Sequence, residues 1–335
     1  MGDTVKTYSD PPARPALQRY SLNGATMGTR YTAVFYGPAG TDAAAIGASL
    51  FTAVDKVDRQ MSTWNPASDL CRVNAAPEHA WIDIPDELAL VIETGLQVGL
   101  ESQGAFDIGV GELVEAWGFG ASGRPVTAPP AAPHGIRHSA GTASLDLDRT
   151  GGRVRKRSPV CIDLSGIAKG YGVDQLAHCL DGWGIASYLV GIDGEMRARG
   201  SKPGGQAWAV AIEKPAYGVR EVAGAMELVD EAMASSGDYR HWIDIAGKRY
   251  SHTMNPALQQ PSSNRLAGVT VLGPTCMLAD AWATALMVLG EQHGPRLARE
   301  RGMVALFTVR NGQRLEEMWV DGASGGTIPD TATAK

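Results

Sequence analysis

The chain has 335 residues, 44% of them hydrophobic and 20% charged, so it can bury a large core and global disorder is excluded. A net charge of −6 and a pI near 5.7 argue against a polyanion-binding surface, because nucleic-acid binders gather Lys and Arg on one face. The dense basic run at 153–157 is expected to be a solvated hairpin turn.

The cysteines and the start of the chain exclude further classes. Cys71, Cys161, Cys179 and Cys276 show no C-x-x-C spacing, so neither a zinc site nor a thioredoxin-like motif is indicated, and their neighbours predict small buried hydrophobes. No segment reaches the roughly 18 apolar residues that a membrane span needs. Residues 1–15 are polar, lack a secretory pattern and are expected to be disordered. The protein is therefore either cytosolic or has lost an export signal.

The first half of the chain is predicted to open with a strand or hairpin at 20–36 and then to become helical. Apolar residues at helical spacing predict a helix at 42–60, which ends before Pro66 because the residue preceding a proline is pushed out of helical geometry. A short helix from Ser68 and a helix at 86–102 follow. The stretch after 118, rich in Gly, Pro, Ala and Ser, predicts a loop insertion near 118–140.

The second half is predicted to be richer in strands, with helices at 166–180 and 276–289. The predicted strands are 144–147, 159–164, 187–192, 196–199, 208–212, 223–228, 241–245, 248–252, 303–309 and 314–319. Segregated helices and strands indicate the α+β class. No G-x-G-x-x-G follows a predicted strand and no phosphate-loop pattern occurs, so a nucleotide must be held in another way.

Asp280 and Thr284 stand one turn apart on an otherwise apolar predicted helix. A buried carboxylate needs a partner, and a carboxylate with a hydroxyl presents two hard oxygens of the kind that Mg²⁺ prefers. The alternative is that Asp280 pairs with a distant Arg and Thr284 bonds to its own helix backbone.

At 163–174 a predicted strand runs through small residues into a helix. Backbone N–H groups, the helix dipole and the Lys169 ammonium could together hold a pyrophosphate there. Glycines at 166, 170 and 172 allow close approach of a ligand, or alternatively tight helix–sheet packing.

His252, at the end of a predicted hairpin strand, could move a proton near neutral pH, or it could simply bond to a loop carbonyl. Met27, Trp64 and Asp107 could help to form a flavin pocket; core packing and helix capping are the alternatives.

Taken in order, these segments resemble the ApbE family of FAD:protein FMN transferases, over roughly 20–289. Seven motifs in register carry the resemblance: Met27-Gly28-Thr29, 61–64 with Ser68 and Asn74, 104–107 with 117–120, 163–174, 237–239, 249–252 and 280–284.

The resemblance implies a single T-fold-like α+β domain at 16–320, with mixed or antiparallel sheets and FAD held in the cleft between two intimate halves, followed by a flexible tail at 321–335. It implies these roles for individual residues: Asp280, Thr284 and the Ala168 carbonyl as Mg²⁺ ligands; Lys169 and the Ser165-Gly166 turn at the pyrophosphate; Met27, Trp64, Asp107 and Glu195 around the dinucleotide; His252 as the catalytic His. Our candidate for proton transfer at the attacking hydroxyl is His252, helped by Asp238. The segment Gly191-Ile192-Asp193-Gly194-Glu195 departs from the two adjacent glycines and following acidic or amide residue of many members, and Met254-Asn255-Pro256 departs from aliphatic-Asp-Pro.

The implied reaction is Mg²⁺-dependent attack of an acceptor Thr or Ser hydroxyl on the FMN phosphorus of FAD, with release of AMP. The implied partner is an acceptor flavoprotein bearing Asp-Gly-x-Ser/Thr-Gly-Ala-Thr/Ser, and the resemblance implies a periplasmic location for the chain itself. The variants at 61–64 and 191–195 resemble the branch serving nitrous-oxide respiration, whose acceptor is membrane-bound.

The tail at 321–327 resembles the acceptor motif except for Gly326, so Thr327 is a hypothetical self-flavinylation site; a flexible terminus is the alternative. Two other functions fit the same residues: an FAD-binding or flavin-delivery protein, and a Mg²⁺-dependent FAD pyrophosphatase.

Overall fold

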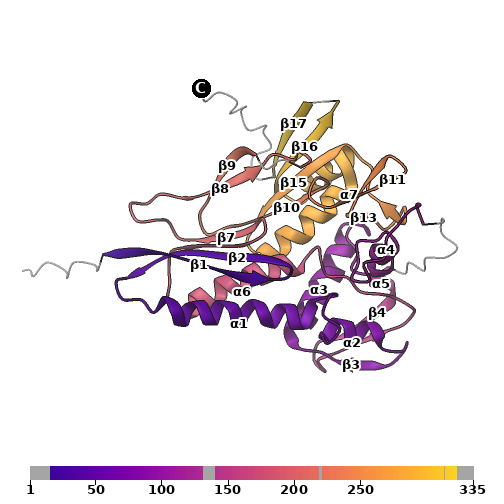
Figure 1. Cartoon of the computed structure of the whole chain (residues 1–335), viewed down its shortest axis with the longest axis horizontal. Helices are drawn as coiled ribbons and strands as arrows, with labels where there is room; N and C mark the ends of the chain where they lie inside the picture. The colour runs from indigo at the N-terminus through magenta and orange to yellow at the C-terminus, as the bar shows by residue number, and fades with distance from the viewer. Residues whose placement is uncertain (1–15, 131–139, 219–220, 313, 323–335) are drawn as a thin grey trace, which may run out of the picture.

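A computed structural model describes residues 16–130, 140–218, 221–312 and 314–322, and an antiparallel sheet of eight strands runs through these parts of the chain (Figure 1). In spatial order the strands are β1 (Leu17–Thr26), β2 (Thr29–Pro38), β6 (Tyr188–Ile192), β7 (Glu195–Arg199), β10 (Ala232–Gly237), β15 (Leu266–Gly273), β16 (Val304–Asn311) and β17 (Arg314–Asp321). The N-terminal and C-terminal hairpins form the two edges, so the sheet joins both halves of the sequence.

Three long helices pack against the sheet and each other: α1 (Ala43–Met61), α6 (Ala168–Gly182) and α7 (Cys276–Glu300) (Figure 1). Strand alternation decides which side chains they cover. On β2, Tyr31, Ala33 and Phe35 join the cluster under the helices, whereas Val34 and Tyr36 join a smaller cluster with the hairpin β8 (Trp208–Glu213) and β9 (Val222–Leu228).

Side-chain caps fix where two of the three long helices, α1 and α7, begin. Asp42 accepts a hydrogen bond from the Ala45 N–H at the start of α1, and Thr275 accepts one from the Leu278 N–H at the start of α7. The Asp174 carboxylate of α6 also accepts from the backbone N–H groups of Cys276 and Met277, at 3.0 and 2.9 Å. One carboxylate therefore ties α6 to the first turn of α7.

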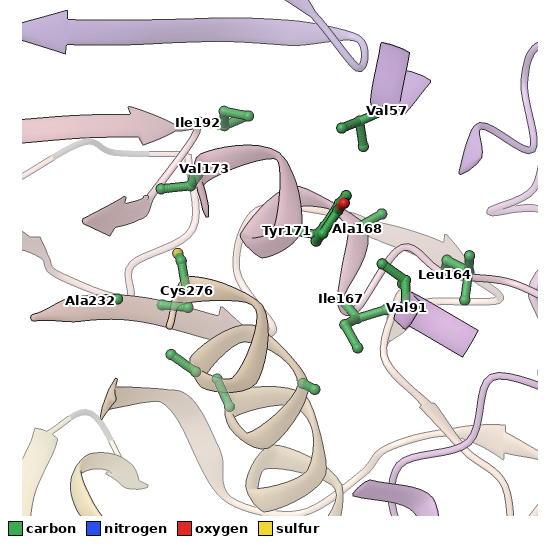
Figure 2. Close-up of a cluster of buried hydrophobic side chains, with 14 of the residues drawn as sticks. Val57, Val91, Leu164, Ile167, Ala168, Tyr171, Val173, Ile192, Ala232 and Cys276 are labelled. Carbon is green, nitrogen blue, oxygen red and sulfur yellow. The ribbon is translucent and has the colours of Figure 1, made fainter. Parts of the chain in front are cut away.

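The core centres on α6 (Figure 2). Its buried residues, which include Tyr171 and Val173, pack against α1, β6, β7 and α7, and the 16-residue helix α3 (Asp86–Glu101) adds to the same core cluster. A helix packed on several sides cannot rotate without disrupting the core. The side chains at the N-terminus of α6 are therefore held in a fixed position relative to the elements packed around it.

A smaller layer lies beside α3 and is built from α2 (Asp69–Ala75), α4 (Gly111–Ala116), α5 (Gly141–Ser144) and a three-stranded sheet. That sheet has the order β3 (Trp81–Asp83), β5 (Arg153–Lys156), β4 (Leu145–Asp148). Two further hairpins stand apart from the main sheet, β11 (Trp242–Ile245) with β12 (Lys248–Ser251) and β13 (Met254–Asn255) with β14 (Gln260–Pro261).

The α+β class and the long helices are confirmed, while several local predictions are wrong. The basic run at 153–157 is not a turn: it contains the central strand β5, whose Arg153 and Arg155 stack on Trp81 and pair with Asp148 and Asp146. The predicted strand at 159–164 contributes a single bridge, between Cys161 and Val110.

Other differences concern extent and burial. α7 runs past 289 to Glu300, through a kink at Gly290 where φ is 76°. Cys276 is buried, whereas Cys71, Cys161 and Cys179 are half-buried. No described helix combines the length and apolar character needed to span a membrane. Residues 1–15, part of the 118–140 insertion and the tail from 323, Thr327 included, lie outside the described residues.

Candidate functional site

A cavity of about 840 Å³ lies where α6 and α7 meet the β1–β2 turn, the β6–β7 turn and the small hairpins. This volume is in the range of binding sites for organic ligands. Ten of the residues predicted to form the site line it: Met27, Trp64, Asp107, Ser165, Gly166, Lys169, Glu195, His252, Asp280 and Thr284. Ala168 and Asp238 do not line it. The structure thus gathers residues from distant parts of the sequence into one place.

Asp280 and Thr284 both face this cavity, next to the start of α6. Asp280 is 4% exposed, and its Oδ2 accepts a hydrogen bond from the Gly170 N–H at 3.0 Å. Thr284 is half-buried, with its Oγ1 3.0 Å from Ser236 Oγ. A Cβ placed on Gly166 would lie 3.2 Å from Thr284 Oγ1. The carboxylate and the hydroxyl therefore meet the 163–174 junction, as the sequence predicts.

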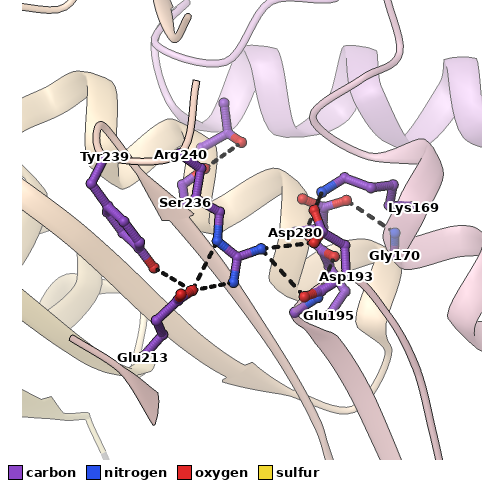
Figure 3. A network of polar contacts seen from close by, with 11 residues as sticks. Lys169, Gly170, Asp193, Glu195, Glu213, Ser236, Tyr239, Arg240 and Asp280 are labelled. Carbon is purple, nitrogen blue, oxygen red and sulfur yellow. Dashed lines mark hydrogen bonds and ion pairs between the residues drawn. The ribbon is translucent and has the colours of Figure 1, made fainter. Parts of the chain in front are cut away.

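Carboxylates outnumber cations around Lys169 (Figure 3). The Lys169 Nζ lies 2.7 Å from Glu195 Oε1 and 3.7 Å from Asp193 Oδ2, and Asp280 faces the same space. Burial, followed by repulsion from Glu195, raises the pKa of Asp280 to about 7. Burial lowers the pKa of Lys169, but Glu195 and Asp280 more than offset this and hold it above its ordinary value. Lys169 stays charged, while the surplus of negative charge favours an added cation.

The oxygens present fit a hard divalent cation. No group of three or more His, Cys, Asp or Glu side chains in the described chain converges as a metal cluster, so an ion would be held by a mixed set. Asp280 and Thr284 supply a carboxylate and a hydroxyl, and Ala168 begins α6 two residues before the Gly170 that bonds to Asp280. Such a set leaves positions for water and phosphate oxygen, which is the usual coordination of Mg²⁺.

The start of α6 offers fewer free N–H groups than the sequence suggests. The N–H groups of Ile167 and Ala168 both donate to the Leu164 carbonyl, and the Gly170 N–H donates to Asp280. Positive potential for an anion therefore comes mainly from Lys169 and the helix dipole. Of the three glycines, only Gly166 faces the cavity, where a ligand could approach it. Gly170 packs tightly on the Cys276 carbonyl, and Gly172 packs on Met27.

His252 follows β12, and its ring both lines the cavity and meets a loop carbonyl. Its ring lines the cavity, and its Nδ1 lies 3.2 Å from the His241 carbonyl oxygen. Because a carbonyl only accepts, Nδ1 carries the proton and Nε2 keeps its lone pair. Burial and the nearby His241 side chain lower the pKa of His252 to about 4, so the ring is neutral at pH 7. A neutral imidazole with a fixed tautomer is suited to accepting a proton.

Asp238 has other partners. Its carboxylate accepts hydrogen bonds from Arg310 at 2.6 Å and from the Tyr217 hydroxyl at 2.9 Å. The group that orients His252 is the His241 carbonyl instead. A helper role of Asp238 at His252 has no support in these contacts.

The three residues predicted for the flavin pocket reach the cavity from different segments of the chain. Met27 and Gly28 form the two-residue β1–β2 turn with φ of 45° and 70°, which places Met27 against Gly172 of α6. Trp64 is 66% exposed and presents a large apolar surface to a ligand or partner. Asp107 accepts hydrogen bonds from the N–H groups of Gly109 and Gly141, so it also organises its own loop.

Sequence reasoning missed several lining residues, notably Asp193, Glu213, Tyr239, Arg240 and His241. Asp193 lies in the segment 191–195, which the sequence identified only as a departure from the family pattern. Arg240 and His241 directly follow Gly237-Asp238-Tyr239, so their adjacency to that motif was the one available signal.

Comparisons with known proteins agree on one family. The model of the ApbE family matches residues 27–307. The chain is 36% identical to the FAD:protein FMN transferase of Vibrio cholerae serotype O1 over 306 residues, covering 91% of each chain. It is 35% identical to that of Klebsiella pneumoniae over 306 residues, covering 90% of this chain and 87% of the relative.

Solved structures give the same result. The apo flavinyl transferase ApbE of Pseudomonas stutzeri superposes with a TM-score of 0.83 at 34% identity, covering 93% of this chain and 98% of the other. The flavin transferase ApbE of Vibrio cholerae gives a TM-score of 0.78 at 33% identity, covering 92% and 98%.

Proposed function

The chain belongs to the ApbE family, and on that premise we propose that it transfers FMN from FAD to a Ser or Thr hydroxyl of an acceptor protein, with Mg²⁺ bound and AMP released. Its relatives named FAD:protein FMN transferase support the transferase class and FAD as the substrate. The observation that carries the finer proposal is the meeting of Asp280, Thr284, Lys169 and His252 in one cavity.

The metal part of the proposal rests on the oxygen donors. Asp280, Thr284 and the Ala168 carbonyl would hold Mg²⁺, which would neutralise charge on the pyrophosphate and on the departing AMP. Lys169, charged and placed beside these donors, binds the same pyrophosphate. Positioning and charge neutralisation then lower most of the barrier, as in other phosphoryl transfers.

The proton part rests on His252. The acceptor oxygen attacks the FMN phosphorus, its proton passes to His252 Nε2, and the bond from that phosphorus to the AMP oxygen breaks. The His241 carbonyl holds Nδ1–H, which keeps Nε2 directed to the substrate. Trp64 and Met27 pack against the rings of the dinucleotide in this arrangement.

The acceptor and the location belong to the same proposal, supported by the family resemblance. We expect the protein to be periplasmic and its acceptor to be a flavoprotein with Asp-Gly-x-Ser/Thr-Gly-Ala-Thr/Ser, membrane-bound if the nitrous-oxide-respiration branch is the right one. Cell fractionation of the protein expressed from its native gene tests the location: recovery with cytosolic markers contradicts it.

One experiment separates the three candidate functions. The protein is incubated with FAD, with or without Mg²⁺ and with or without a peptide bearing the acceptor motif, and products are followed by mass spectrometry. Covalent FMN on the peptide, dependent on Mg²⁺, supports transfer. FMN and AMP formed without peptide support hydrolysis, and FAD left intact with peptide present supports a binding protein.

The same assay tests the tail hypothesis. An increase in the intact mass of the protein by one FMN, mapped to Thr327, supports self-flavinylation. An unmodified tail under conditions that label the peptide refutes it.

A further inference from the structure

A row of five alternating charges crosses one wall of the cavity: Glu213, Arg240, Asp193, Lys169 and Glu195 (Figure 3). The Arg240 Nε and Nη2 lie 3.0 and 2.5 Å from Glu213 Oε2, and its Nη1 lies 2.9 Å from Asp193 Oδ1. Lys169 continues the row, 3.7 Å from Asp193 and 2.7 Å from Glu195. The row thus links β8, the segment after β10, the β6–β7 turn, α6 and β7.

Asp193 is the link between the two cations. With Gly194 it forms the turn between the paired residues Ile192 and Glu195, at a φ of 58° that Asp and Asn tolerate better than most side chains. One carboxylate oxygen is hydrogen-bonded to Arg240, whereas the other stays 3.7 Å from Lys169, too far for a hydrogen bond. Arg240 therefore holds Asp193 just short of direct contact with Lys169.

Removal of the Arg240 guanidinium would change the position of Asp193 relative to Lys169. Without Arg240, Lys169 is the nearest cation to Asp193. A partly buried carboxylate gains most by closing on such a neighbour, because attraction is strong where water is excluded. Lys169 would then be flanked by Asp193 and Glu195 at hydrogen-bond distance, with fewer N–H donors and less positive potential for a substrate anion.

We propose that Arg240 is a positioning residue of the transfer reaction, which keeps the Lys169 ammonium available to the FAD pyrophosphate by holding Asp193. This inference rests on the proposed contact between Lys169 and the pyrophosphate. Arginine suits the task because its planar guanidinium donates two N–H groups to Glu213 and a third to Asp193 in fixed directions, a geometry that an ammonium does not reproduce.

A double-mutant cycle tests the coupling. The KM for FAD and kcat are measured for R240Q, D193N and R240Q/D193N, with FMN transfer to the motif peptide as the readout and thermal melting as the check on folding. We expect R240Q to raise the KM for FAD about tenfold, the loss of one charge-assisted contact. D193N alone should stay within about twofold, because Asn tolerates the turn and releases no carboxylate. The double variant should return to within about threefold of D193N.

Two further variants serve as controls for the double-mutant cycle. R240K, which keeps the charge without the fork, should give an intermediate KM that D193N also rescues. R153Q, an Arg to Gln change at the Asp148 pair in the three-stranded sheet, should leave the KM unchanged.

If the KM of R240Q for FAD equals that of the wild type, Arg240 is irrelevant and the proposal is overturned. If the KM of the double variant is as high as that of R240Q, Arg240 acts on the substrate directly and the proposal is overturned as well. A K169A variant with the wild-type KM refutes the assignment of Lys169 and this proposal with it. Absence of transfer by the wild type refutes the proposed function instead.

Discussion

The cavity has two walls that are supported in different ways. The charged wall consists of Lys169, Asp193, Glu195, Asp280 and Thr284, mounted on α6, α7 and the central sheet. The hairpin wall, at 241–256, carries His252 and is mounted on the two-stranded pairs β11–β12 and β13–β14.

The charged wall is continuous with the main core, whereas the hairpin wall is held by a cluster of four buried residues, Leu113, Trp117, Ile245 and Met254. Fewer buried contacts mean a lower cost of local opening. Lys169, Asp280 and Thr284, the groups proposed to bind the nucleotide and its cation, are therefore fixed by the main core, while the proposed base stands on a part whose local opening should cost less free energy.

Replacement of Asp280 should have the largest effect, since it removes the proposed cation from the charged wall. D280N should lower FMN transfer about 1,000-fold or more, the several kcal/mol that a bound metal contributes to a transition state. Its melting temperature without Mg²⁺ should not fall, because a neutral amide replaces a buried carboxylate beside Glu195. Addition of Mg²⁺ should raise the melting temperature of the wild type and not that of D280N; an equal rise in both contradicts the assignment.

Replacement of His252 tests the hairpin wall. H252A should lower kcat about 100-fold or more, the usual contribution of a general base, with FAD affinity within about twofold of wild type. Kinetics together with FAD titration check both quantities. Unimpaired transfer would remove His252 from the mechanism.

A glycine substitution tests how far the charged wall depends on the core. A methyl group at Gly170 would overlap the Cys276 carbonyl and press on Asp280, so G170A should destabilise the fold by about 1–3 kcal/mol and reduce the response to Mg²⁺. G182A, at the other end of α6, is the matched control, because nothing lies within 4 Å of the added methyl group. Denaturant unfolding compares the two, and equal stability would mean that α6 and α7 can shift freely.

The smallest expected effect is on the pH dependence of stability. The pKa of His252 is about 4 in the folded protein and near its ordinary 6.5 when unfolded. Its contribution to stability is therefore complete above pH 6.5 and declines as pH falls toward 4. Wild type should lose more unfolding free energy than H252A between pH 7 and 4.5. Parallel pH profiles would show that the ring is freely solvated.

Local patterns in the sequence predicted the helices and the shared face of Asp280 and Thr284 on α7. Apolar spacing and a lone carboxylate in an apolar helix are both local signals. α1 begins after Asp42, and Asp280 and Thr284 face one cavity as expected. The strand at 153–156 was missed because its charges are paired and stacked by partners distant in sequence, such as Trp81. β10 was missed for a similar reason, since its small residues become a strand through pairing with β7 and β15. β15 was missed although its apolar and β-branched run at 269–272 is itself a local strand signal.

The functional site shows the same difference between local signals and long-range contacts. Motifs located Lys169 and His252, but no pattern within the chain could tell that Asp193 and Arg240, 47 residues apart, share a hydrogen bond. The partners of Asp238 were equally hidden, because Arg310 approaches it from β16. Long-range charge pairing is a property of the folded chain alone.

The Asp174 carboxylate, which binds the first turn of α7 while also pairing with Arg197 of β7 at 2.5 Å, locks two helices and a strand together. Asp174 does not line the cavity, so it fixes the spacing of Lys169 on α6 and Asp280 on α7 without offering an atom to a ligand. Loss of this one carboxylate should therefore disturb the cavity from outside it.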